Sequence, residues 1–71
     1  MSRFVMRVQV NGEEREVEDG VSLSQLLDTL GIERARVAVE VNAEIVRRAR
    51  HAEVQLKPGD QIEIVTFVGG G

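Results

Sequence analysis

The chain has no cysteine and no tryptophan, and its 71 residues include only one histidine, one proline and two phenylalanines. Without cysteine there can be no disulfide, no thiolate metal site and no side chain that carries sulfur covalently. Stability must come from aliphatic packing. A chain this short can build one domain with a single, thin core.

The sequence also lacks long apolar runs and an excess of basic residues. No segment approaches the length of a membrane span, and residues 1–6 lack the apolar stretch of a signal peptide, so we expect a cytoplasmic protein without a membrane partner. A net charge of −3 argues against nucleic acid as the main partner. We interpret the local charge clusters as solvated faces: basic at Arg47, Arg48 and Arg50, and acidic at Glu13, Glu14, Glu16, Glu18 and Asp19.

The first half of the chain predicts a β-hairpin followed by a helix. Apolar residues alternate along residues 4–10, Asn11-Gly12 suits a tight turn, and residues 15–18 form a short returning strand. Ser22 is the expected helix N-cap, with Gln25 completing a capping box and Gly31 closing the far end. The buried face of this helix carries Leu23, Leu26, Leu27 and Leu30.

The second half predicts three further strands, at residues 37–41, 45–46 and 61–67, with turns at Asn42-Ala43 and at residues 57–60. Residues 47–55 fit no single element. Together these elements predict an α+β domain in which one main helix covers a mixed sheet of four to five strands. Pairing of the first strand with the last would make it a β-grasp. We expect residues 1–68 to form this domain and residues 69–71 a flexible tail.

Side chains suited to catalysis are scarce. His51 stands among arginines with no second histidine, which favours a surface or packing role over general-base chemistry. Ser22 and Ser24 are explained by the start of the helix, and the hairpin carboxylates by solvation, so neither set predicts a nucleophile or a metal site. We therefore expect no enzyme activity and no bound cofactor or metal.

The C-terminal end is the unusual feature. A strongly patterned strand stops at Phe67-Val68 and is followed by Gly69, Gly70, Gly71 and a carboxylate. Glycines without side chains could thread a narrow channel in another protein, and a carboxylate becomes reactive once adenylated, so that a persulfide can convert it to a thiocarboxylate. An inert, frayed terminus accounts for the glycines equally well.

The chain resembles the ThiS family of sulfur carriers over nearly its whole length, from about Met6 to Gly71. The resemblance rests on an ordered set of motifs: Val10-Asn11-Gly12-Glu13, Leu23-Ser24-Gln25-Leu26-Leu27 with Leu30-Gly31, Val37-Ala38-Val39-Glu40-Val41-Asn42, Gly59-Asp60, Ile62-Glu63-Ile64-Val65 and Phe67-Val68-Gly69-Gly70-Gly71.

The resemblance implies a ubiquitin-like β-grasp fold and a function as sulfur carrier in thiamine biosynthesis. Gly71 would be adenylated by an E1-like, ThiF-type adenylyltransferase that uses ATP and magnesium, and would then receive sulfur from a persulfide donor. Gly70 and Gly69 would enter the active sites of that enzyme and of a ThiG-type thiazole synthase. Phe67 and Val68 are candidates for docking, which we expect on the sheet face away from the helix.

Two other functions stay open at this stage. A carrier of the same architecture could serve molybdopterin synthesis, because partner choice depends on surface contacts. A ubiquitin-like modifier would instead transfer an activated Gly71 to a lysine of another protein.

Overall fold

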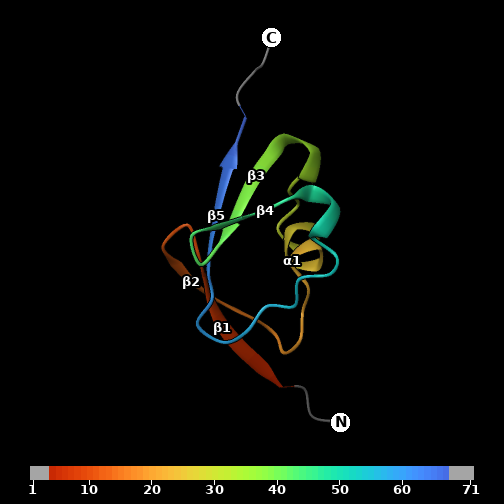
Figure 1. Cartoon of the computed structure of the whole chain (residues 1–71). Helices are drawn as coiled ribbons and strands as arrows, with labels where there is room; N and C mark the ends of the chain where they lie inside the picture. The colour runs from red at the N-terminus through yellow and green to blue at the C-terminus, as the bar shows by residue number, and fades with distance from the viewer. Residues whose placement is uncertain (1–3, 68–71) are drawn as a thin grey trace.

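The computed structural model describes residues 4–67, which form one sheet crossed by one main helix (Figure 1). The elements in chain order are β1 (Val5–Val10), β2 (Glu13–Glu18), α1 (Leu23–Thr29), the short 3₁₀ turn η1 (Arg34–Arg36), β3 (Val37–Val41), β4 (Glu44–Val46), a second 3₁₀ turn η2 (Arg48–Arg50) and β5 (Gln61–Thr66). The two 3₁₀ turns lie in segments for which the sequence predicted no regular element.

The sheet has five strands in the order β2-β1-β5-β3-β4. β1 and β5 pair in parallel at its centre, whereas the other neighbouring pairs are antiparallel. The predicted pairing of the first strand with the last is therefore confirmed, as are the mixed sheet and the single covering helix. This topology places the last strand between two neighbours rather than at an edge.

The β1–β2 hairpin follows the predicted pattern. Met6, Val8 and Val10 are buried, and the residues between them are exposed, as expected when one face of a strand packs against a core. Asn11 and Gly12 have φ angles of 50° and 83°, which the type I′ hairpin turn requires. Because Val10 pairs with Glu13, the returning strand begins two residues earlier than the sequence predicted.

Helix α1 has the predicted signal at each end. The Ser22 side chain accepts a hydrogen bond from the Gln25 amide at 3.1 Å, and Gln25 Oε1 accepts one from the Ser22 amide at 2.9 Å, which completes the capping box. Gly31 has a φ of 72°, and the Ile32 amide donates to the Leu27 carbonyl at 2.9 Å, as in a Schellman motif. The capping box therefore sets where the helix begins, and the Schellman motif sets where it ends.

The core lies between α1 and the sheet. Its buried aliphatic residues are Met6, Val8, Val10, Leu23, Leu26, Leu27, Val37, Val39, Leu56 and Ile62. The segment that follows β4 closes one end of this core, because the carbonyls of His51 and Val54 accept hydrogen bonds from the Ser24 and Leu23 amides at 3.0 and 2.8 Å. Those amides belong to the first turn of α1, where no partner exists within the helix.

Candidate functional site

The site predicted from the sequence begins where β5 ends. Phe67 is the last residue that the structure describes, and Val68, Gly69, Gly70 and Gly71 lie outside the described residues. The boundary expected between a domain of residues 1–68 and a tail of residues 69–71 also lies outside the described residues. What the structure establishes is how β5, which leads to this end of the chain, is held in the sheet.

The start of β5 is fixed by the side chain of Asn42, in the β3–β4 turn. Asn42 has a φ of 53°, and its Oδ1 accepts a hydrogen bond from the Gln61 amide at 2.9 Å. Its Nδ2 donates to Asp60 Oδ1 at 2.9 Å, and Asp60 Oδ2 accepts from the Lys57 amide at 2.8 Å. The turn before β5 is thereby tied to the turn between its neighbouring strands.

Further along, β5 is held by the side chain of Asn11 from the other side. β1 pairs with β5 only through Gln9 and Val10, opposite Gln61 and Ile62. Beyond that point Asn11 Oδ1 accepts from the Ile64 amide at 2.7 Å, and Asn11 Nδ2 donates to the Ile64 carbonyl at 3.2 Å. The asparagine side chain thus continues the ladder of β1 after its backbone has turned away.

The sequence predicted only turns at these two asparagines and missed their contacts with β5. Asparagine tolerates positive φ and has both a donor and an acceptor, which is the signal available in the sequence. These contacts can be predicted only when the strand order is known, because that order places β5 between the two turns.

At the end of β5 the backbone stays in the sheet while the side chain faces solvent. The Phe67 amide donates to the Arg36 carbonyl at 2.8 Å, just before β3 begins. The Phe67 ring is 59% exposed, as is Val65 two residues earlier. Phe67 is therefore exposed at the end of β5, and its role in docking stays a prediction.

The charge clusters lie on the surface as predicted. Arg47, Arg48 and Arg50 are exposed, and Arg50 pairs with Glu53 at 3.0 Å. On the hairpin, Arg7 lies 3.6 Å from Glu14 with both side chains well exposed. Exposed pairs of this kind contribute little to stability. These clusters therefore affect the electrostatic potential at the surface more than the stability of the fold.

The sequence favoured a surface or a packing role for His51, and the structure shows the packing role in a fully buried form. Its side chain is 1% exposed, Nε2 lies 3.2 Å from the Val46 carbonyl, and Nδ1 has no partner. Since a carbonyl only accepts, Nε2 carries the proton of the neutral ring. Burial lowers the pKa of His51 below its ordinary value of 6.5, with further lowering by Arg34 and Arg48 and an opposing contribution from the Val46 carbonyl.

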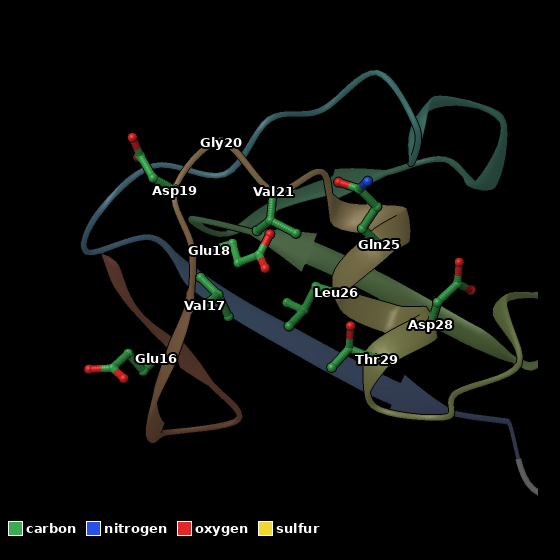
Figure 2. Close-up of a pocket in the computed structure, with 10 residues that line it drawn as sticks. All are labelled: Glu16, Val17, Glu18, Asp19, Gly20, Val21, Gln25, Leu26, Asp28 and Thr29. Atoms are coloured by element: carbon green, nitrogen blue, oxygen red, sulfur yellow. The ribbon is translucent and has the colours of Figure 1, made fainter. Parts of the chain in front are cut away.

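A cavity of about 550 Å³ lies between β2 and α1, and no residue of β5 lines it. Figure 2 shows Val17, Val21 and Leu26 pointing into this space, whereas Glu16 and Asp19 point out of it. The ionisable residues of its lining are all acidic.

Across residues 4–67, no group of three or more histidine, aspartate or glutamate side chains is arranged to hold a metal ion. Within that same range no helix has the length and hydropathy needed to cross a membrane.

A mixed sheet with parallel first and last strands at its centre and one helix across it defines a ubiquitin-like β-grasp protein. The ThiS family model matches residues 8–71, and the Sulfur carrier protein ThiS of Bacillus subtilis is 42% identical over 65 residues, which are 90% of this chain and 98% of that protein. The chain belongs to the ThiS family.

Structural comparison agrees with this assignment. The crystal structure of the thiamine biosynthesis protein ThiS from Geobacter metallireducens matches with a TM-score of 0.80 at 33% identity, covering 93% of this chain and all of that one. A protein named thiazole synthase from Paramagnetospirillum magneticum is 44% identical over 66 residues, but the chain spans only 20% of its length. A second thiazole synthase, from Magnetococcus marinus, shows the same identity and coverage.

Proposed function

We propose that this chain is a sulfur carrier of thiamine biosynthesis, with the Gly71 carboxylate as its reacting group. It acts as a protein co-substrate in the cytoplasm, and the enzymes that act on it supply the catalysis. The observation that carries the proposal is the family match. This match extends to residue 71 and so includes the residues that follow the end of β5 at Thr66.

In the first step a carboxylate oxygen of Gly71 attacks the α-phosphorus of ATP. The bond to the leaving pyrophosphate breaks, and an acyl adenylate forms. ATP and magnesium belong to a ThiF-type adenylyltransferase, where the metal neutralises phosphate charge. Adenylation is needed because a carboxylate is a poor electrophile until its oxygen becomes part of a good leaving group.

In the second step the terminal sulfur of a persulfide donor attacks the Gly71 carbonyl carbon, and AMP leaves. The resulting acyl disulfide is cleaved by a thiol, which forms a disulfide and releases the carrier as a thiocarboxylate. A ThiG-type thiazole synthase then takes the sulfur. The lack of cysteine in the carrier suits this route, because no side chain competes for the sulfur.

The residues before Gly71 have simple roles in this scheme. Gly70 and Gly69 have no Cβ, so backbone groups of a partner can approach them closely inside a narrow channel. Phe67 and Val68 stand at the mouth of that channel. The exposed Phe67 ring provides the first apolar contact outside it.

Intact mass spectrometry tests the proposal. The carrier is incubated with the adenylyltransferase of the same organism, ATP, magnesium, a persulfide donor and a thiol. We expect one oxygen to be replaced by sulfur, and fragmentation to place the change at Gly71. Deletion of Gly71, or addition of one residue after it, should abolish the change while leaving the melting temperature unaltered.

An unchanged mass with an enzyme shown to be active on another carrier would contradict the proposal. Parallel reactions with thiazole synthase and with molybdopterin synthase then identify the pathway, because only the cognate synthase should consume the thiocarboxylate. Covalent ladders on other proteins, lost when Gly71 is removed, would instead favour a protein modifier.

A further inference from the structure

The outer side of β2 is a free sheet edge, because no strand among residues 4–67 pairs with it there. The bonds of β1 show which backbone groups point to this side. The Gln9 amide donates to the Asp60 carbonyl at 2.9 Å, and the Arg7 carbonyl accepts from the same turn at 2.7 Å, so both residues turn their backbone away from β2. Their register partners are Glu14 and Glu16. Since residues that face each other in an antiparallel pair are either bonded to each other or both turned away, Glu14 and Glu16 present their amides and carbonyls to the outer side.

The helix side of this edge strand is hollow. The cavity of about 550 Å³ lies there, between β2 and α1, and Val17 and Leu26 point into it (Figure 2). Val17 shares its side of the sheet with its register partner, the buried Met6. Because side chains alternate along a strand, Glu14 and Glu16 lie on the opposite side. A strand added to this edge would therefore have one set of side chains over an apolar cavity and the other set beside two carboxylates.

The charge of the edge favours one kind of strand. Four of the six residues of β2 are glutamate and one is arginine, and the ionisable residues that line the cavity are also acidic. Glu14 contacts Arg7 at 3.6 Å, whereas Glu16 forms no ion pair within residues 4–67. Charged edge strands resist pairing with a second copy of the same chain, because like charges would then face each other. The same charges attract a basic strand.

We propose that β2 and the cavity beside it bind an extended segment of another protein, in which apolar and basic residues alternate. The segment adds antiparallel to β2, so that its apolar side chains cover Val17 and Leu26 and its basic side chains lie opposite Glu14 and Glu16. Main-chain hydrogen bonds supply affinity in this kind of recognition, and the alternating side chains supply specificity. The proposal goes beyond the proposed function, because this surface does not include Gly71.

The position of this surface leaves the C-terminal strand uncovered. β1 lies between β2 and β5 in the sheet, and neighbouring strands are about 4.8 Å apart, so the added strand lies about 14 Å from β5. A protein that binds at β2 can therefore hold the carrier without contacting β5.

A short peptide of alternating lysine and valine, about seven residues long and blocked at both ends, is the probe. It is titrated at low salt into the full isotope-labelled chain, and binding is followed through the amide chemical shifts. We expect the largest shifts at Glu14, Glu16, Val17 and Leu26, and slower hydrogen exchange of the two glutamate amides. A peptide of the same composition with lysines and valines in two separate blocks should bind about tenfold more weakly, because it cannot direct them to opposite faces.

Methylation of the peptide backbone tests for strand addition. In an antiparallel pair the residue opposite Glu16 exchanges both hydrogen bonds with it, and the two side chains lie on the same face. The lysines therefore direct their amides at β2, and the valines direct theirs away from it. N-methylation of the lysines should abolish binding, whereas N-methylation of the valines should change the affinity by less than about threefold.

The double variant Glu14→Gln with Glu16→Gln tests the charge of the edge. It should weaken binding about tenfold at low salt and less at high salt, because the lost attraction is electrostatic. Glu44→Gln with Glu63→Gln is the matched control, since it removes two exposed carboxylates from β4 and β5 and gives the same net charge. The control should change the affinity by less than about twofold, and both variants should melt close to the wild type.

Four results would overturn the proposal. They are no binding of the alternating peptide, equal affinity for the alternating and block peptides, equal effects of the two double variants, and full binding of the peptide that is N-methylated at its lysines. Shifts confined to β3, β4 and β5 would place the peptide on another surface and would also reject it. None of these measurements uses Gly71, so their failure would leave the proposed function standing.

Discussion

Replacing Asn11 with alanine should loosen β5 by removing its contact on the β1 side. The variant loses two hydrogen bonds to the Ile64 backbone, at 2.7 and 3.2 Å, each worth about 1 kcal/mol net. It also places alanine at a φ of 50°, which costs about 1 kcal/mol more than asparagine does. We expect a loss of about 2 to 3 kcal/mol in the free energy of unfolding, or about 10 to 20 °C in melting temperature.

Urea denaturation measures the global loss, and amide hydrogen exchange of Ile64 measures the local one. Asn11→Gly is the control, because glycine adopts positive φ without strain, so lower protection at Ile64 in this variant reports the missing side-chain bonds alone. The reasoning fails if Ile64 keeps wild-type protection in both variants. It also fails if Asn11→Ala unfolds within about 0.5 kcal/mol of the wild type.

Three further predictions concern the core, the helix cap and the buried histidine. Leu27→Ala should destabilise the fold by about 2 to 4 kcal/mol, because Leu27 is fully buried and leaves a cavity; an unchanged thermal melt would contradict this. Ser22→Ala should cost about 1 kcal/mol in urea denaturation through loss of the capping box, with a smaller effect for Ser24→Ala. Because the pKa of His51 is lowered on folding, its contribution to stability is complete above pH 6.5 and is lost as the pH falls through the lower folded value; melts of His51→Leu should lack this slope.

Local signals in the sequence predicted most of the fold. The alternation in residues 4–10, the Asn11-Gly12 turn and the Ser22 and Gly31 helix boundaries each have a local physical cause, and the structure confirms each of them. The β-grasp topology follows less directly from pattern, since strand order depends on contacts between distant segments. The family resemblance supplied that part.

Features that depend on distant contacts could not be predicted. Residues 47–55 have no clear period because this segment packs across the start of α1, and it holds its place through the carbonyls of His51 and Val54. His51 sits in a run of arginines that indicates surface, yet its ring is buried. Only the position of β4 beside it explains how one residue of this charged run reaches the core.

The register of β5 links the fold to the proposed function. A slip of one residue would turn Val65 and Phe67 toward the core and Ile62 and Ile64 toward solvent, because side chains alternate between the two faces of a strand. Asn42 fixes this register at Gln61 and Asn11 fixes it at Ile64, from opposite sides of the strand. The same contacts that keep the isoleucines in the core therefore also determine which side chains of β5 face solvent.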